Sequence, residues 1–212
     1  MKKILLIGSD GQLGSAIKKY FINKKEFFFI NKKTLDVTIE EDLSKVINKI
    51  KPDIIINCVA YTNVVNSEKE LFMAETLNVT YINNLSKICL LRNIKLIHFS
   101  SDYVYDGKKN EAYKENDISN PLNNYGLSKL KGDLYIEKTL NNYIIIRCSW
   151  LFSGTNDCFL SKVYKNIGNN KDFLVDNTSR GNPTFVNHLV EAIEILLKYL
   201  DDKKDINGVF NF

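Results

Sequence analysis

The chain has 212 residues, of which 44% are hydrophobic and 25% are charged, and its formal net charge is +4. This composition is typical of a soluble globular protein with one large domain or slightly more. The lysines are scattered in short turns such as "NKK" and "DGKKN", so no nucleic-acid partner is expected. No apolar run approaches the length that crosses a membrane, so no membrane association is expected either.

The cysteines and histidines indicate neither a disulfide framework nor a metal site. The four cysteines form no C-x-x-C pair, and Cys58 and Cys148 lie in apolar runs, as small buried side chains in a reducing compartment do. His98 and His188 are too few and too separated for zinc, so no metal is expected. The apolar run "ILLI" stops at Gly8, whereas a secretory signal needs about 7–15 such residues. We therefore expect a cytoplasmic protein.

Strand and helix patterns alternate along the first 150 residues. In chain order the sequence predicts a strand over 2–8, a helix over 12–23, short strand-like pieces over 26–31 and 35–38, a helix over 39–51, a buried strand over 53–60, a long helical stretch over 67–92, a strand over 95–101, a helix over 123–140 and a strand over 142–150. Continuous apolar strands that alternate with helices predict an α/β fold, with a doubly wound parallel sheet of Rossmann type covered by helices on both faces.

This rhythm changes after Trp150. Amphipathic helices are predicted over 158–167 and 185–200, with a loop over 177–184 between them. The tail is too small to be a complete second domain. We therefore predict a Rossmann domain over 1–152, followed by a small, incomplete C-terminal part over 153–212.

The stretch "GSDGQLG" places Gly8, Gly11 and Gly14 between the first predicted strand and the first predicted helix. A glycine-rich turn here lets the backbone approach a pyrophosphate, and the helix N-terminus offers N–H groups to the anion. The spacing alone is weak, since glycines can also merely turn a corner. Asp10 would repel a phosphate, so its carboxylate must point away or support the turn.

The end of the second predicted strand bears on the choice of cofactor. An acidic residue usually holds a ribose 2′-hydroxyl at this point, but here "EFFFI" is followed by Asn31, Lys32 and Lys33. Two lysines without a carboxylate favour a 2′-phosphate, and hence NADP over NAD. The alternative is that both lysines are ordinary solvated surface residues.

The stretch "YGLSK" places Tyr125 and Lys129 one helical turn apart on the same face. An ammonium group there stabilises a phenolate, which lowers the tyrosine pKa and allows proton exchange near neutral pH. Three other Tyr/Lys pairs have the same spacing, at residues 20 and 24, 105 and 109, and 199 and 203. Only Tyr125 follows a strand that ends in hydroxyl groups, at Ser100 and Ser101, where the ligand crevice of a parallel sheet lies.

The chain as a whole resembles an extended short-chain dehydrogenase/reductase of the dTDP-4-dehydrorhamnose reductase family. The matching stretches run in family order from residue 4 to about residue 211, and they are "GSDGQLG", "LDVT", "INCVAYTNV", "NVT", "HFSSDYVYDG", "PLNNYGLSK", "IIIRCSW" and "GNPT". "SDYVYDG" together with "NYGLSK" is far more specific than the glycines alone.

The resemblance implies a role for each residue that matches the family pattern. Tyr125 is the implied proton donor, Ser101 bonds the substrate carbonyl, and Lys129 holds the nicotinamide ribose and tunes Tyr125. Together with the glycine turn and the end of the second predicted strand, the resemblance predicts cofactor binding by Gly8, Gly11, Gln12, Leu13, Gly14, Asn31, Lys32, Asp36, Val37, Ala60, Tyr61, Thr62, Asn78, Tyr125 and Lys129. The residues implied in substrate binding are Ser101, Asp102, Tyr125 and Trp150. For Trp150 a large core anchor is the alternative interpretation.

The implied activity is that of an NAD(P)-dependent oxidoreductase acting on a CH–OH group. NADP(H), with NAD(H) as the alternative, gives hydride to the C4 carbonyl of a nucleotide-linked 4-keto-6-deoxy sugar, as in dTDP-rhamnose and polysaccharide biosynthesis. The implied partners are this nucleotide sugar and a second copy of the chain, with which it would form a homodimer. The alternatives are a regulatory subunit that binds NADP without turnover and a related nucleotide-sugar epimerase or epimerase–reductase.

Three departures from the family pattern stand beside the resemblance. Val65 occupies a position where the family usually has an acid, and Thr178 and Ser179 stand where it often has Asp-Gln. The chain also stops at "GVFNF", where relatives continue through a longer substrate domain. All three concern the substrate side of the predicted site.

Overall fold

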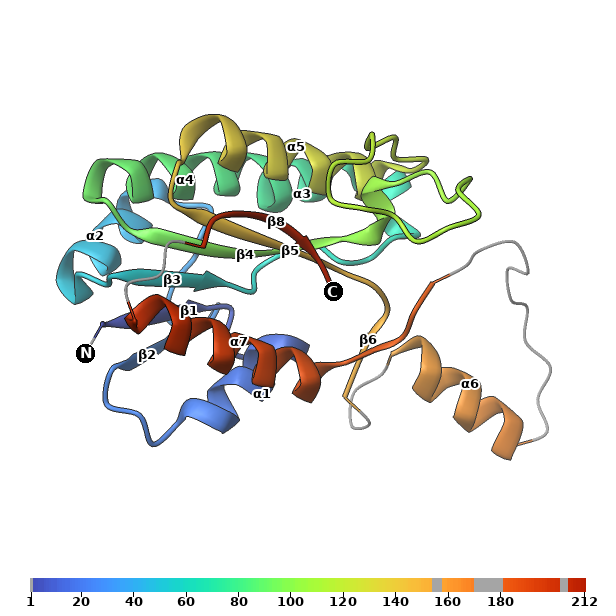
Figure 1. Cartoon of the computed structure of the whole chain (residues 1–212), viewed down its shortest axis with the longest axis horizontal. Helices are drawn as coiled ribbons and strands as arrows, with labels where there is room; N and C mark the ends of the chain where they lie inside the picture. Colours follow the sequence, from blue (N-terminus) through green and yellow to red (C-terminus); the bar gives the residue numbers. More distant parts are fainter. Residues whose placement is uncertain (1, 154–157, 170–180, 203–205) are drawn as a thin grey trace.

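The computed structural model describes residues 2–153, 158–169, 181–202 and 206–212. Within these residues a six-stranded parallel sheet forms the centre, and helices cover both of its faces (Figure 1). The Rossmann-type α/β fold that the sequence predicts is thus confirmed. No helix of the described residues combines the length and the apolar character needed to cross a membrane.

The sheet has the strand order β2-β1-β3-β4-β5-β8. Its strands are β1 (Ile4–Ile7), β2 (Phe27–Ile30), β3 (Ile54–Asn57), β4 (Lys95–Ser101), β5 (Tyr143–Cys148) and β8 (Gly208–Asn211). A separate parallel pair is formed by β6 (Leu151–Phe152) and β7 (Thr184–Phe185). The strands β1 to β5 all lie within predicted ranges, because a strand buried on both faces is a continuous apolar run.

Seven α-helices are present in the described residues. They are α1 (Gln12–Phe21), α2 (Glu40–Ile50), α3 (Leu71–Glu75), α4 (Tyr81–Arg92), α5 (Asn124–Thr139), α6 (Phe159–Gly168) and α7 (Val186–Asp201). The helical stretch predicted over 67–92 is divided, since a 3-10 turn (Asn66–Glu68) and α3 precede a π-helical turn (Thr76–Thr80) and α4. The π-helical turn contains Asn78, a predicted site residue.

Two hydrophobic clusters hold the layers together. Ile4 and Leu6 of β1 join one cluster with residues of α1 and α7, whereas Leu5 and Ile7 join the other with residues of α2, α4 and α5. This alternation follows the two-residue period of a strand, which sends successive side chains to opposite faces. Figure 1 shows the same division for four of these helices, with α1 and α7 below the sheet and α4 and α5 above it.

The strand-like piece predicted over 35–38 is a turn in the structure, and that prediction is wrong. The Asp36 carboxylate accepts hydrogen bonds from the backbone N of Thr38 at 3.0 Å and from its Oγ1 at 2.7 Å. An aspartate that binds its own backbone two residues ahead closes a turn and competes with strand formation.

The last described residues complete the sheet and were only partly predicted. Helix α7 agrees with the predicted range except for its last residue, Asp201, and packs with α1, whereas β8, for which no strand was predicted, pairs in parallel with β5. Residues beyond 152 therefore supply a covering helix and an outer strand of the same sheet. It stays a prediction that residues 1–152 bind the cofactor and that residues 153–212 bind the substrate.

Candidate active site

The predicted site residues gather at the carboxyl ends of the parallel strands. The glycine turn follows β1, Tyr61 lies shortly after β3, Ser101 ends β4 and Trp150 follows β5. The first strand of the chain, β1, lies between β2 and β3, so the chain reverses its winding direction there. In open α/β sheets ligands bind at the carboxyl ends beside such a switch point.

The glycine turn brings the start of α1 close to the end of β1. Gly8 has a φ of +87°, which side-chain-bearing residues rarely adopt. A Cβ atom on Gly14 would lie 2.0 Å from the carbonyl oxygen of Gly8, so only glycine permits this approach. Gly11 caps α1, and within the described residues no side-chain hydrogen bond caps this helix, which leaves its first turn open to an anion.

The other side chains of this turn are placed differently. The hydroxyl of Ser9 is buried and has no hydrogen-bond partner among the described residues. The Asp10 carboxylate lies 4.0 Å from Lys18 Nζ of α1. Gln12 Nε2 donates to the carbonyl oxygen of Leu151 at 3.0 Å and so links α1 to β6.

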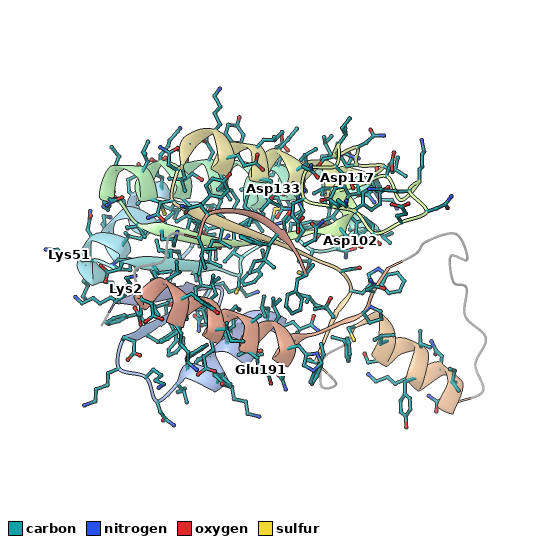
Figure 2. All side chains as sticks on the ribbon, viewed as in Figure 1. Lys2, Lys51, Asp102, Asp117, Asp133 and Glu191 are labelled. Atoms are coloured by element: carbon teal, nitrogen blue, oxygen red, sulfur yellow. The ribbon has the colours of Figure 1, made fainter. Side chains whose placement is uncertain are left out.

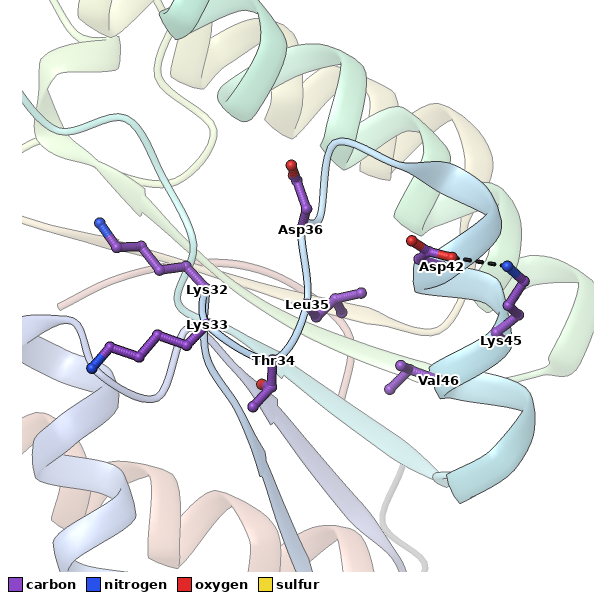
Figure 3. A pocket seen from close by; sticks show the side chains of 8 residues that line it. All are labelled: Lys32, Lys33, Thr34, Leu35, Asp36, Asp42, Lys45 and Val46. Carbon is purple, nitrogen blue, oxygen red and sulfur yellow. Dashed lines mark hydrogen bonds and ion pairs between the residues drawn. The ribbon is translucent and has the colours of Figure 1, made fainter.

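The loop after β2 borders an open pocket of about 400 Å³. The Asn31 side chain accepts hydrogen bonds from the backbone N of Lys33 at 3.0 Å and of Thr34 at 3.2 Å, which fixes the loop. The side chains of Lys32 and Lys33 extend to the same side of the loop (Figure 3). The residues that line the pocket are Lys32, Lys33, Thr34, Leu35, Asp36, Asp42, Lys45 and Val46. The hydrogen bonds from Thr38 lower the pKa of Asp36.

Asn78 fixes the loop that contains Ala60, Tyr61 and Thr62. Its Oδ1 accepts from the backbone N of Tyr61 at 2.9 Å, and its Nδ2 donates to the Tyr61 carbonyl at 3.0 Å and to Ser128 Oγ of α5 at 2.9 Å. A Cβ atom on Gly132 would lie 2.3 Å from the carbonyl oxygen of Asn78. The π-helical turn, the loop after β3 and α5 are therefore held together at one point.

The start of α5 is pressed against the turn that follows β4. The Asn123 side chain caps the helix by accepting from the backbone N of Gly126 at 2.7 Å. A Cβ atom on Gly126 would lie 2.1 Å from the carbonyl oxygen of Tyr103. This close approach brings Tyr125 beside Ser101, and the ring of Tyr125 packs edge-on against that of Tyr103 at a centroid distance of 5.6 Å.

The electrostatics of Tyr125 differ from the sequence-based expectation. Burial raises the pKa of Tyr125 above that of a free tyrosine, and the neighbouring Ser101 hydroxyl opposes this rise. Lys129 is itself buried, donates to the carbonyl oxygen of Phe99 at 2.8 Å, and lies with Nζ 3.1 Å from His98 Nε2. Burial lowers the pKa of Lys129. Burial is thus the larger influence on the pKa of Tyr125 in this structure, and the lowering of that pKa by Lys129 stays a prediction.

The residues predicted on the substrate side lie after β4 and β5. Asp102 accepts from Ser149 Oγ at 2.6 Å and from Ser101 Oγ at 3.2 Å. Burial raises the pKa of Asp102, and these two bonds oppose the rise. Trp150 is half-buried with a φ of +40°, and a Cβ atom on Gly181 would lie 2.9 Å from its ring. The indole thus lies directly over the backbone at Gly181.

The whole chain, residues 1–212, matches the family described as RmlD substrate binding domain. A dTDP-4-dehydrorhamnose reductase from Aggregatibacter actinomycetemcomitans is 32% identical, and the match covers 100% of this chain and 73% of that protein. The chain belongs to the dTDP-4-dehydrorhamnose reductase family. It is thus a member of an oxidoreductase family.

Two solved members of the dTDP-4-dehydrorhamnose reductase family have the same fold. The Bacillus anthracis protein, solved in complex with NADP, has a TM-score of 0.91 at 29% identity, covering 100% of this chain and 74% of that chain. The Clostridium acetobutylicum protein has a TM-score of 0.86 at 32% identity, covering 99% and 73%. The family resemblance seen in the sequence is thereby confirmed.

The departures from the family pattern have different outcomes. The Val65 side chain is largely exposed, and Thr178 and Ser179 lie outside the described residues.

Among the described residues no cluster of three or more His, Cys, Asp or Glu side chains could hold a metal ion, and the four cysteines are free thiols.

The sequence analysis did not predict a buried polar network between α5 and the strands β4 and β5. Asp133 of α5 accepts from Ser100 Oγ at 2.8 Å and from Arg147 Nε at 3.3 Å, and Arg147 donates to the Tyr105 hydroxyl at 2.8 Å. Figure 2 labels Asp133, which lies between α5 and the sheet. A charged residue inside the apolar strand "IIIRC" was the available signal. His98, in the middle of "KLIHFSS", carried the same signal.

Proposed function

We propose that the chain is an NADP(H)-dependent reductase of a nucleotide-linked 4-keto-6-deoxy sugar. The observation that carries this proposal is the position of Tyr125, which is buried at the start of α5 and lies beside Ser101 at the carboxyl end of β4. The named relatives of the chain are dTDP-4-dehydrorhamnose reductases, which supports a sugar nucleotide as the substrate.

The glycine turn suits a dinucleotide. The close approach of Gly14 to Gly8, the uncapped start of α1 and the buried, unpartnered hydroxyl of Ser9 together make a surface for a pyrophosphate. Gly8, Gly11, Gln12, Leu13 and Gly14 would hold this group, Leu13 through its backbone because its side chain is in the core. When bound, the nicotinamide supplies the hydride.

The opposite end of the dinucleotide would lie along the loop after β2. Lys32 would face a 2′-phosphate, and Asn31, Asp36 and Val37 would hold the adenosine. The absence of a carboxylate directly after β2 favours NADP(H) over NAD(H). The Bacillus anthracis relative, solved with NADP, supports the same choice.

The remaining cofactor contacts would come from Ala60, Tyr61 and Thr62, with Asn78 fixing their loop from behind. The sugar nucleotide would lie against Asp102 and Trp150. In terms of roles, residues 1–152 would carry the cofactor, and α6 with the segment around β7 would serve the substrate.

The chemistry follows from the protonation state of Tyr125. Tyr125 carries its proton at neutral pH, as a general acid must, although burial raises its pKa and so makes it a weaker acid. Tyr125 would donate this proton to the carbonyl oxygen as it becomes an alkoxide. Ser101 would bond the same oxygen and orient it.

Turnover of the purified chain tests this proposal. NADPH oxidation is followed with a dTDP-linked 4-keto-6-deoxy sugar, and Tyr125→Phe should lower kcat by about 100-fold or more because the proton donor is lost. Tyr135→Phe is the matched control, since Tyr135 lies on the same helix and is partly exposed. NADPH binding without turnover would favour a regulatory subunit, and sugar isomerisation without net NADPH oxidation would favour an epimerase.

A further inference from the structure

The three residues that follow β5 are bound from two sides, by the glycine turn and by the turn after β4. On one side, Gln12 Nε2 donates to the Leu151 carbonyl oxygen at 3.0 Å. On the other side, the Ser149 hydroxyl donates to Asp102 Oδ2 at 2.6 Å. Trp150, the single tryptophan of the chain, lies between these two anchored residues. Its position is therefore tied to both parts of the proposed site.

Trp150 adopts a backbone conformation that needs support from its surroundings. Its φ of +40° lies in the left-handed region, which residues with a side chain rarely adopt and which persists only where neighbouring contacts fix it. The Trp150 carbonyl accepts from the backbone N of Thr184 at 3.3 Å, and a Cβ atom on Gly181 would lie 2.9 Å from the indole. The bond from Gln12 to the next carbonyl along the chain adds a support that comes from the glycine turn.

The first turn of α1 has little support from its own side chains. Within the described residues no side-chain hydrogen bond caps α1, and its first turn contains no acidic side chain. Backbone N–H groups at such a helix start can donate to a pyrophosphate, which then holds the turn in place. Gln12 is the first residue of α1, so an anion bound there also restricts the side chain that reaches Leu151.

We propose that Gln12 is a positioning residue that couples cofactor binding to the position of Trp150. The bond from Gln12 to the Leu151 carbonyl keeps Trp150 in its left-handed conformation once the first turn of α1 is held by a pyrophosphate. The inference rests on the proposed function, in which this turn binds NADP(H) and Trp150 contacts the sugar nucleotide. Because such coupling is reciprocal, each ligand should tighten the binding of the other.

The same coupling extends to the proposed catalytic hydroxyl. Asp102, which binds Ser149, also accepts from Ser101 Oγ at 3.2 Å. A displacement of the segment that contains Trp150 would therefore change the hydrogen bonds of Asp102 and, through Asp102, those of Ser101. A chain without the Gln12 bond would bind the cofactor without aligning the substrate side.

The fluorescence of Trp150 tests the proposal on the full chain without turnover. NADP⁺ is the probe, since it carries no hydride to transfer and its own emission does not interfere. At saturating NADP⁺ the acrylamide quenching constant of Trp150 should fall. The affinity for a dTDP-linked 4-keto-6-deoxy sugar, which NADP⁺ cannot reduce, should rise by about five-fold or more.

Two variants of α1 assign this response to Gln12. Gln12→Met keeps the length of the side chain but cannot donate, so NADP⁺ should change neither the quenching constant nor the affinity for the sugar nucleotide. Leu13 and Leu151 belong to the same hydrophobic packing, which keeps this variant folded. Ser15→Ala is the matched control, because the exposed Ser15 hydroxyl donates to the Gln12 carbonyl at 3.1 Å and not to the segment after β5. It should respond as the unsubstituted chain does.

The outcomes separate this proposal from the proposed function. Each comparison is made within one protein at saturating NADP⁺, so a weaker affinity for the cofactor does not alter it. An equal response of Trp150 in Gln12→Met and in the unsubstituted chain, or no response in either, would overturn the coupling. Turnover of the sugar nucleotide without a response of Trp150 would leave the proposed function intact, whereas a response without turnover would contradict the proposed function and support the coupling. A chain that does not bind NADP⁺ would overturn both.

Discussion

Lys32 and Lys33 occupy the position after β2 at which an acidic residue would mark an NAD-binding site. Replacing both by alanine should weaken NADPH binding by about ten-fold, because a charge-assisted bond to the 2′-phosphate is lost. Binding of NADH, which lacks that phosphate, should not change. Nucleotide fluorescence titrations measure both affinities.

The matched control for these lysines lies in the same pocket. Lys45 lines it but is paired with Asp42 at 2.9 Å, so Lys45→Ala should leave both affinities nearly unchanged. An equal loss for NADPH and NADH in the double variant would mean that the lysines do not select the cofactor.

Asp133 should give the stability of the protein an unusual pH dependence. Burial raises the pKa of Asp133 from 3.8 to about 6, so the folded protein binds this proton more tightly than the unfolded chain. The contribution of Asp133 to stability is therefore greatest below about pH 4 and decreases as the pH rises through 6. The decrease is on the order of 3 kcal/mol for a shift of this size.

Comparison with Asp133→Asn isolates this effect from the other titrating groups. In urea titrations, the free energy of unfolding of the variant should equal that of the unsubstituted chain near pH 4. Above pH 6 the variant should have the larger free energy of unfolding. A variant that loses stability relative to the unsubstituted chain as the pH rises would contradict the raised pKa.

At the level of single residues, the sequence predicted which side chains lie near one another better than it predicted the directions of their pKa shifts. The Tyr125 and Ser101 pair could be found because a strand ending in hydroxyl groups precedes a helix that begins with tyrosine. The direction of the Tyr125 pKa could not be found, because it depends on burial by neighbours that are distant in sequence. The partners of Lys129 were hidden for the same reason, since His98 lies 31 residues away.

The close contact between α1 and β1 depends on Gly14. Substitution by alanine would place a Cβ atom 2.0 Å from the Gly8 carbonyl oxygen, so α1 must move away from the end of β1. We expect Gly14→Ala to abolish measurable NADPH binding and to lower the free energy of unfolding by about 1–3 kcal/mol. Fluorescence titration and urea unfolding measure the two effects.

Gly168 provides the matched control at the end of α6. A Cβ atom there would meet no atom of the described residues within 4 Å, so Gly168→Ala should change neither property beyond about 0.5 kcal/mol. A Gly14→Ala variant that binds NADPH normally would show that the turn does not require this close approach.

Elements buried on both faces were predicted well, whereas elements defined by local polar chemistry were not. The strand β4 has the bounds that its apolar run predicts. The piece over 35–38 has a strand-like composition, but Asp36 closes it into a turn. The division of the helix predicted over 67–92 depends on packing around Asn78, which no periodicity in the sequence reveals.

At the scale of the whole molecule, β8 ties the end of the chain to the sheet. It pairs with β5, and the Lys95 ammonium of β4 donates to the Ile206 carbonyl at 2.8 Å and to Asn207 Oδ1 at 2.7 Å. Removing residues 206–212 should lower the free energy of unfolding by roughly 3 kcal/mol or more, because the edge of β5 and its core contacts become exposed. Urea unfolding followed by circular dichroism measures the change.

The substitution Phe210→Ser is the control for this truncation. The Phe210 side chain is 39% exposed, so the substitution keeps the backbone pairing of β8 and should cost less than the truncation. An unfolding midpoint unchanged by the truncation would show that the sheet is complete without β8. No strand was predicted there, since "GVFNF" is short and its pairing with β5 crosses more than 60 residues of sequence.

The central claim is that hydride passes from the nicotinamide to C4 of a sugar nucleotide at the Tyr125 site. Its most direct test uses NADPH deuterated at the transferable C4 position, with a dTDP-linked 4-keto-6-deoxy sugar and analysis of the product by NMR and mass spectrometry. We predict one deuterium at C4 of the product sugar, formed by the unsubstituted chain and by Tyr135→Phe, and far more slowly by Tyr125→Phe. A product without deuterium at C4, or the same rate of formation with Tyr125→Phe, would contradict the claim.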